Sequence, residues 1–174
     1  MDFRIVKPGD VASLLAYFEG LSSETKNFFA PHSFDVNTVE SVCHGKLDTT
    51  SFVGMYDGHI VGYAVIKPGY SEGELYRYPG YPIEMTPDRD FIFAPSLADE
   101  YQSKGWGTGL LHFVEDHLRM IGAGKIALWG GVQKRNARAV RFYQKNGFIV
   151  LGEFHHEGID NFDMVKHLEP HQME

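Results

Sequence analysis

The feature that most constrains this chain is a glycine-rich segment between an apolar strand and an amphipathic helix. The segment reads Gln102-Ser103-Lys104-Gly105-Trp106-Gly107-Thr108-Gly109. It follows an apolar run over 90–98, and apolar side chains then recur at helical spacing over 108–120. The first amides of a helix have no partner within the helix, and the helix dipole adds positive charge there. Because glycine lacks a Cβ, an anion can approach these amides, so the segment predicts a phosphate-binding turn with Lys104 at its rim.

The spacing of this turn excludes two common nucleotide sites. A P-loop needs Gly-Lys-Ser/Thr in that order, whereas Lys104 precedes its glycine. The dinucleotide fingerprint needs a third glycine at position 110, which is Leu110, so a nucleotide-dependent oxidoreductase is disfavoured. The alternative without a ligand is that the glycines only permit a tight turn between strand and helix.

The order of elements indicates a mixed α/β fold. In the C-terminal half, strands over 90–98 and 125–132 flank the helix over 108–120, and a crossover of this kind predicts that the two strands are parallel. A helix over 136–145 follows, with closing strands over 148–154 and 161–168. The elements expected in the N-terminal half are a strand over 3–6, helices over 11–20, 22–29 and 35–45, and strands over 50–56 and 60–67 joined at Asp57-Gly58.

Residues 68–88 are rich in proline, glycine and tyrosine and are expected to form a loop insertion. A loop of this length inside a compact domain is usually either mobile or functional. Two interpretations remain open from the sequence. The segment is either a surface insertion packed by its own tyrosines or a lid on the substrate side.

Composition restricts the class of protein. The chain has 174 residues, 43% of them hydrophobic, which suits one compact domain over 1–174. Its 16 Lys and Arg against 23 Asp and Glu give a net charge of −7, which argues against a nucleic-acid partner. No apolar run is long enough for a membrane span. The one cysteine, Cys43, is expected to be a small buried hydrophobe, and the absence of an internal disulfide partner suggests a cytoplasmic setting.

The glycine-rich turn resembles a known signature. Gln102-x-x-Gly105-x-Gly107 is similar to the Arg/Gln-x-x-Gly-x-Gly/Ala loop of the GNAT superfamily of acetyl-coenzyme-A-dependent N-acyltransferases. A second signature of that family, with an asparagine, a helix, a tyrosine and Gly-Phe, is matched by Asn136, Ala139, Tyr143 and Asn146-Gly147-Phe148. Residues 162–168 look like the family's last strand, so the resemblance covers 90–168 well.

The resemblance implies a fold and a cofactor. The implied fold is a central mixed sheet with a splayed pair of parallel strands, flanked by helices, in which acetyl-CoA lies in the wedge as a co-substrate and no metal is used. Main-chain groups of the strand end would bind the pantetheine arm, and the amides of the turn would bind the pyrophosphate. The implied cofactor contacts are Leu97, Ala98, Asp99, Gln102, Ser103, Lys104, Gly105, Trp106, Gly107, Thr108, Asn136 and Tyr143.

The same resemblance implies a catalytic role for Tyr143. A phenol near the thioester sulfur can protonate the thiolate that leaves when the tetrahedral intermediate collapses. The competing interpretation is a core tyrosine packed beside Phe142 and Phe148. A backbone amide near Leu97 or Ala98 would meet the oxyanion, because a splayed strand leaves a donor unpaired. For Asn136, a ligand contact and a helix N-cap are both compatible with its position.

The base that deprotonates the acceptor is not selected by any spacing. The candidates are Glu84, Asp90, Glu100 and the pair His155 and His156, with Glu84 as first choice. Neighbouring residues on a strand point to opposite faces, so the two histidines are not expected to share a metal.

The predicted function is therefore an N-acetyltransferase that moves an acetyl group from acetyl-CoA to a primary amine in a ternary complex. The amine can belong to a small molecule or to a peptide, and the acidic balance favours a cationic acceptor. The alternative is a non-catalytic acyl-CoA-binding module on the same fold. A homodimer is compatible with the sequence, which contains no pattern that selects an oligomeric state.

Overall fold

The computed structural model describes residues 1–169, whose contacts form two compact units. One unit comprises Met1–Lys67 and Ala94–Asp116, and the other comprises Pro68–Phe93 and the chain from His117 onward. Strand β4 (Asp90–Leu97) and helix α5 (Trp106–Met120) each pass from one unit into the other.

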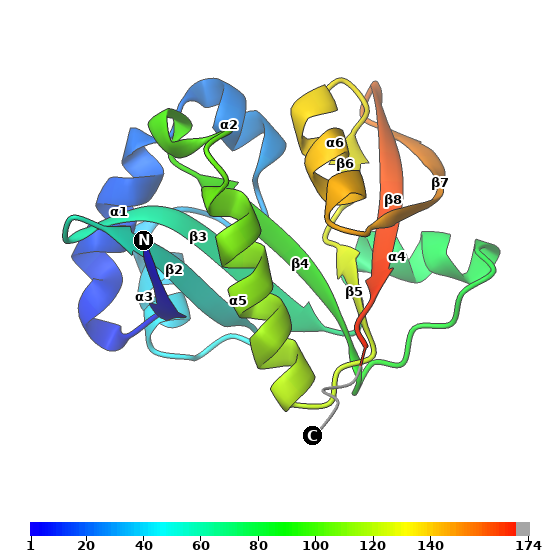
Figure 1. Ribbon diagram of the computed structural model, residues 1–174, viewed down its shortest axis with the longest axis horizontal. Coiled ribbons are helices and arrows are strands. Elements are labelled where there is room, and N and C mark those ends of the chain that lie inside the picture. The colour runs from blue at the N-terminus through cyan, green and yellow to red at the C-terminus, as the bar shows by residue number, and fades with distance from the viewer. Residues whose placement is uncertain (170–174) are drawn as a thin grey trace. The chain divides into compact units, whose positions relative to one another are not determined.

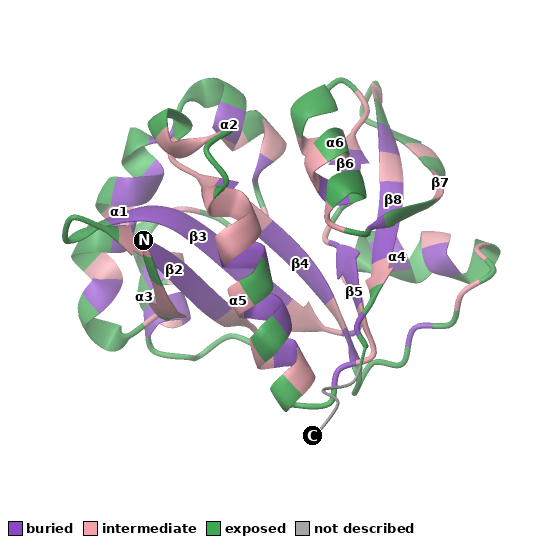
Figure 2. Ribbon diagram, in the orientation of Figure 1, coloured by how far each residue is buried: buried purple, intermediate pink, exposed green. Residues whose placement is uncertain are grey.

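Besides its parts of β4 and α5, the first unit contains an antiparallel meander and the helices α1, α2 and α3. Its elements are β1 (Asp2–Ile5), α1 (Val11–Gly20), α2 (Ser23–Phe28), α3 (Val36–Cys43), β2 (Thr50–Tyr56) and β3 (His59–Pro68). β2 pairs with both β1 and β3. The turn between β2 and β3 has positive φ at Asp57 (48°) and Gly58 (76°), which confirms the predicted hairpin. Most of β2 and β3 is buried, as Figure 2 shows.

The second unit is built around β8. Its elements are α4 (Glu72–Arg77), β5 (Lys125–Leu128), β6 (Val132–Gln133), α6 (Ala137–Lys145), β7 (Ile149–His156) and β8 (Ile159–His167). β8 pairs antiparallel with β5, β6 and β7. β4 and β5 are parallel, with Asp90 opposite Lys125 and Phe93 opposite Leu128, which confirms the predicted crossover.

The strand pairings define one mixed sheet. Within residues 1–169 the sheet has eight strands. Seven follow the order β1-β2-β3-β4-β5-β8-β6, and the eighth, β7, pairs with β8 (Figure 1). The mixed α/β fold class is therefore confirmed. Among the helices of this described part, none is long and apolar enough to cross a membrane.

The predicted strand over 125–132 is wrong because the chain turns after Leu128. Gly130 and Gly131 both adopt left-handed backbone, with φ of 72° and 68°. A Cβ on Gly131 would lie 2.5 Å from the carbonyl oxygen of Phe162. The glycine pair thus divides one expected strand into β5 and β6, since a left-handed pair cannot continue a strand.

Residues 68–88 are more ordered than the expected loop. They form α4 and a short 3-10 helix over Tyr78–Gly80. The ring centroids of Tyr70 and Tyr81 each lie 5.5 Å from that of Tyr78. The tyrosines thus pack on one another, as the first of the two interpretations predicts. Tyr78 is buried in a core cluster of this unit. The segment is therefore a packed part of its unit.

The glycine pair gives a test of the turn after β5. Replacing Gly131 by alanine is expected to lower the free energy of unfolding by about 3 kcal/mol, because strain is added to a clash with backbone. Gly130→Ala meets open space, so only the left-handed backbone cost of about 1 kcal/mol is expected. Urea denaturation of both variants measures the difference. Equal losses would contradict the assigned close approach to Phe162.

Candidate functional site

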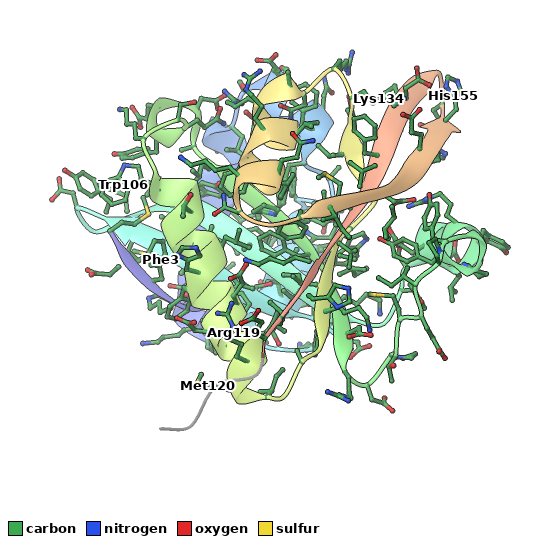
Figure 3. The ribbon with its side chains drawn as sticks, turned by 45° about the vertical axis from the view of Figure 1, so that its right-hand side comes forward. Phe3, Trp106, Arg119, Met120, Lys134 and His155 are labelled. Atoms are coloured by element: carbon green, nitrogen blue, oxygen red, sulfur yellow. The ribbon has the colours of Figure 1, made fainter. Side chains whose placement is uncertain are left out.

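The glycine-rich turn lies at the start of α5, within the first unit. The first helical bond of α5 runs from the Gly109 amide to the Gly105 carbonyl, at 3.4 Å. The amides of residues 106–108 therefore precede that bond and cannot be paired within the helix. Residues 103–105 are exposed, and Figure 3 shows Trp106 at the first turn of the helix.

Two residues of the turn have left-handed backbone, Ser103 with φ of 59° and Gly105 with φ of 83°. Where right-handed and left-handed residues follow one another in a turn, successive amides point toward one side and form a concave anion site. A left-handed backbone is strained for a serine, and strain of this kind is concentrated at functional sites. The turn can therefore hold a phosphate with its main chain.

The side chain of Gln102 holds the turn from inside the protein. Its Nε2 donates to the Leu97 carbonyl oxygen at 3.0 Å and to Thr25 Oγ1 at 3.2 Å. The side-chain nitrogen of Gln102 thus stabilises the segment that joins β4 to α5.

Asp99 connects the same segment to α2. Its carboxylate accepts hydrogen bonds from the Ser22 amide (3.0 Å), Ser22 Oγ (2.6 Å) and Thr25 Oγ1 (2.8 Å). Burial alone would raise the pKa of Asp99, but these hydrogen bonds lower it below the ordinary value of an aspartate. The Asp99 side chain is therefore an anchor that stays ionised at neutral pH.

The structure decides which of the two backbone amides, that of Leu97 or that of Ala98, is already bonded. The Ala98 amide donates to the Val61 carbonyl at 2.9 Å, and the Ala98 carbonyl accepts from the Tyr101 amide at 2.8 Å. Ala98 is therefore not the unpaired donor. Successive amides of a strand point to opposite sides, so the amide of Leu97 points away from β3.

The second signature lies in the second unit, on α6. Asn136 Oδ1 accepts from the Ala139 amide at 3.2 Å, which makes Asn136 the N-cap of the helix. Tyr143 is 8% exposed, and its ring lies 5.2 Å from that of Phe142 and 5.3 Å from that of Phe148. Burial raises the pKa of Tyr143, so its phenol is protonated at neutral pH and able to donate.

The candidate bases differ sharply in their surroundings. Asp90 is buried, binds Lys125 Nζ at 3.0 Å and accepts from the Thr86 amide at 2.6 Å. This carboxylate is therefore engaged in holding its unit together. Glu84 and Glu100 are exposed. His155 is exposed as well and bonds to Asp160 at 2.9 Å.

Sequence reasoning missed two buried carboxylates in the second unit. Glu74 and Asp163 have fully buried side chains, and Arg77 contacts both of them. One signal was present, since Ser71 and Glu74 have the spacing of a capping box. Nothing local marks Asp163, because its partner Arg77 lies far away along the chain.

Comparison with known proteins identifies the family. Residues 16–148 match the model of the acetyltransferase (GNAT) family. The chain belongs to the GNAT family. An uncharacterised N-acetyltransferase of Mycobacterium bovis is 31% identical over 123 residues. That match spans 65% of this chain and 64% of the relative, slightly less than two thirds of either.

Solved structures of acetyltransferases share the fold over almost the whole chain. An acetyltransferase of the GNAT family from Streptococcus pneumoniae aligns with a TM-score of 0.73 at 21% identity, covering 97% of this chain and 99% of the other. A putative acetyltransferase from Salmonella typhimurium, solved with its cofactor acetyl-CoA, aligns with a TM-score of 0.71 at 18% identity. That alignment covers 100% of this chain and 97% of the other.

The anchor at Asp99 gives a pH-dependent test. Asp99→Asn is expected to lower the free energy of unfolding at pH 7 by about 1 kcal/mol, because charge-assisted hydrogen bonds become neutral ones. The folded-state pKa of Asp99 is lowered, so this stabilisation is present above the unfolded-state pKa and disappears as the pH falls through the folded value. Thermal denaturation from pH 7 to pH 2 should therefore show the two proteins converging in acid. Glu100→Gln, on an exposed neighbour, is the control. A constant difference at every pH would contradict the assignment.

Proposed function

We propose that this GNAT protein is an N-acetyltransferase that transfers the acetyl group of acetyl-CoA directly to a primary amine in a ternary complex. The observation that carries this proposal is the turn at the start of α5, with left-handed backbone at Ser103 and Gly105, in a chain of this family. Because the family match runs through both compact units, we treat residues 1–174 as one N-acetyltransferase domain.

The pyrophosphate of acetyl-CoA is assigned to the turn. In this assignment the amides of residues 105–108 donate to the phosphate oxygens, and the dipole of α5 stabilises their charge. Lys104 is exposed and adds a full positive charge at the rim. Ser103 and Gln102 shape the turn, the first by its left-handed backbone and the second by its bond to Leu97.

The pantetheine arm is assigned to the end of β4, where it binds as an added strand would. We assign the amide of Asp99 to the pantetheine arm, since the Ala98 amide is bonded to Val61. We assign the Leu97 amide, which points away from β3, to the oxyanion of the tetrahedral intermediate. Asn136, whose Oδ1 caps α6, would use its side-chain nitrogen toward the pantetheine region.

The transfer step needs three proton movements. The amine attacks the thioester carbon, the carbon–sulfur bond breaks, and Tyr143 gives its phenolic proton to the departing thiolate, which leaves as the free thiol. The nitrogen, now bonded to the acetyl carbon, loses its second proton to the Tyr143 phenolate, which restores the phenol and leaves a neutral amide. The raised pKa of Tyr143 keeps that proton in place at neutral pH. The ammonium must lose a proton before it attacks, and Glu84 stays the proposed base because Asp90 is bound by Lys125.

The acceptor is proposed to be a cationic amine, such as a polyamine, an aminoglycoside, a lysine side chain or an N-terminal amine. The net charge of −7 favours the approach of such molecules over long distances. The buried, unpaired thiol of Cys43 fits a reducing compartment, and we propose a cytoplasmic location on that ground.

Release of free thiol from acetyl-CoA, followed over a panel of amines, tests the function. Turnover with at least one primary amine is the expected result. Thermal stabilisation by coenzyme A without turnover on any amine would instead support a non-catalytic acyl-CoA-binding module.

Tyr143→Phe tests the proton donor. The variant is expected to lose about 100-fold in kcat, at the lower end for general acid catalysis, while its affinity for acetyl-CoA stays the same. Tyr76→Phe, on a tyrosine that is 87% exposed, provides the matched control. Unchanged turnover by Tyr143→Phe would remove this residue from the mechanism.

Gly107→Val tests the phosphate turn. A branched side chain in the first turn of α5 is expected to block the pyrophosphate and abolish binding of acetyl-CoA in calorimetry. Gly20→Val, where a side chain meets open space, controls for the loss of a glycine. Normal affinity in a folded Gly107→Val protein would contradict the assigned site.

A further inference from the structure

Glu74 is a fully buried carboxylate that the proposed mechanism does not use. It lies in α4, within the segment over 68–88, and its side chain has no exposed surface. Its Oε1 accepts from the Gly130 amide at 2.6 Å, and its Oε2 accepts from the Ser71 amide at 3.1 Å. A buried carboxylate is expensive unless its charge is well bonded, so its position needs a physical reason.

The charge of Glu74 is only loosely paired. Arg77 lies 3.4 Å from Glu74, but the same guanidinium binds Asp163 through two hydrogen bonds at 2.7 and 2.9 Å. Tyr81 also donates to Asp163, at 2.8 Å. Arg77 therefore serves mainly Asp163. The close contacts of Glu74 are the hydroxyl and amide of Ser71 on Oε2, which form the capping box of α4, and the backbone amide of Gly130 on Oε1.

Gly130 has a specific place in the second unit. The parallel pairing of β4 with β5 ends at Phe93 and Leu128, and the Trp129 amide still donates to the Phe93 carbonyl at 2.9 Å. The next peptide joins Trp129 to Gly130. Glu74 is thus bonded to the first peptide beyond the last hydrogen bond between the two strands.

A carboxylate that accepts a peptide N–H does more than hold it. The negative charge beside the N–H repels the electrons of the peptide toward its carbonyl oxygen. The carbonyl oxygen therefore becomes a stronger hydrogen-bond acceptor. The bond is also charge-assisted and so orients the peptide firmly. Because Gly130 and Gly131 have left-handed backbone, they lie outside a regular strand, and no neighbouring strand orients this peptide.

We propose that Glu74 is a positioning residue for acetyl transfer. It orients and polarises the Trp129–Gly130 peptide so that the Trp129 carbonyl accepts an N–H of the acceptor amine. A hydrogen bond from the amine to this oxygen aims the nitrogen lone pair and increases its electron density. This role rests on the proposed N-acetyltransferase function and adds a carboxylate that acts through the backbone, distinct from the base.

The test compares Glu74→Gln with Glu72→Gln, which makes the same chemical change on an exposed neighbour in the same helix. Glutamine keeps an oxygen for the Gly130 amide but removes the charge. Glu74→Gln is expected to lower kcat/KM for the amine about tenfold, the ratio for a charge-assisted bond made neutral, and to leave the affinity for acetyl-CoA within twofold. The amide proton of Gly130 in NMR spectra should shift upfield in Glu74→Gln and stay in place in Glu72→Gln.

Three outcomes would overturn the role of Glu74. The first is a kcat/KM for the amine that stays within twofold of the unaltered protein, and the second is an unmoved Gly130 amide. The third is a loss of activity that matches the loss of folded protein in thermal denaturation, because a merely structural residue would behave in that way. Absence of turnover by the unaltered protein on every amine would overturn the proposed function itself, and the role of Glu74 with it. Normal turnover by Glu74→Gln would overturn only the role of Glu74.

Discussion

The short parallel pairing between β4 and β5 is the constraint on which the rest of the structure depends. β4 takes part in both compact units, and it pairs with β5 only as far as Phe93 and Leu128. Pro95 has no amide hydrogen to continue a ladder on β4. Beyond Leu128 the chain turns at two left-handed glycines. Beyond Phe93 and Leu128 the two strands therefore no longer pair with each other, so their main-chain groups on the facing side need other partners.

Side chains hold the backbone in the places where regular pairing stops. After β4, Gln102 bonds the Leu97 carbonyl, and Asp99 is bound by residues at the start of α2. After β5, Glu74 bonds the Gly130 amide. At Leu97 and at Gly130 a polar side chain takes the place of a strand partner, because a main chain without such a partner would lose its geometry. A site made of backbone amides needs such support, since its precision depends on the backbone alone.

Local chemistry made much of the fold predictable. The hairpin at Asp57-Gly58 follows from the positive φ that such a turn requires, and the strand over 50–56 was bounded correctly. The parallel arrangement of β4 and β5 follows from the helix between them. The helix within 68–88 was missed because glycines and prolines recur along the segment and interrupt any helical pattern. Its formation depends on burial of Tyr78 and on the bond between Arg77 and Asp163, which are not visible in a local window.

The sequence by itself determined the glycine-rich turn that opens α5, the N-cap at Asn136 and the family, because each depends on residues that are neighbours in the chain. The tertiary structure decided which polar groups are bonded to other parts of the protein. It engaged Asp90 with Lys125, took the Ala98 amide for Val61, and buried Glu74 against Gly130. The physical reason is that burial and hydrogen bonding of a polar group depend on partners brought from distant parts of the chain, and no local pattern encodes those partners.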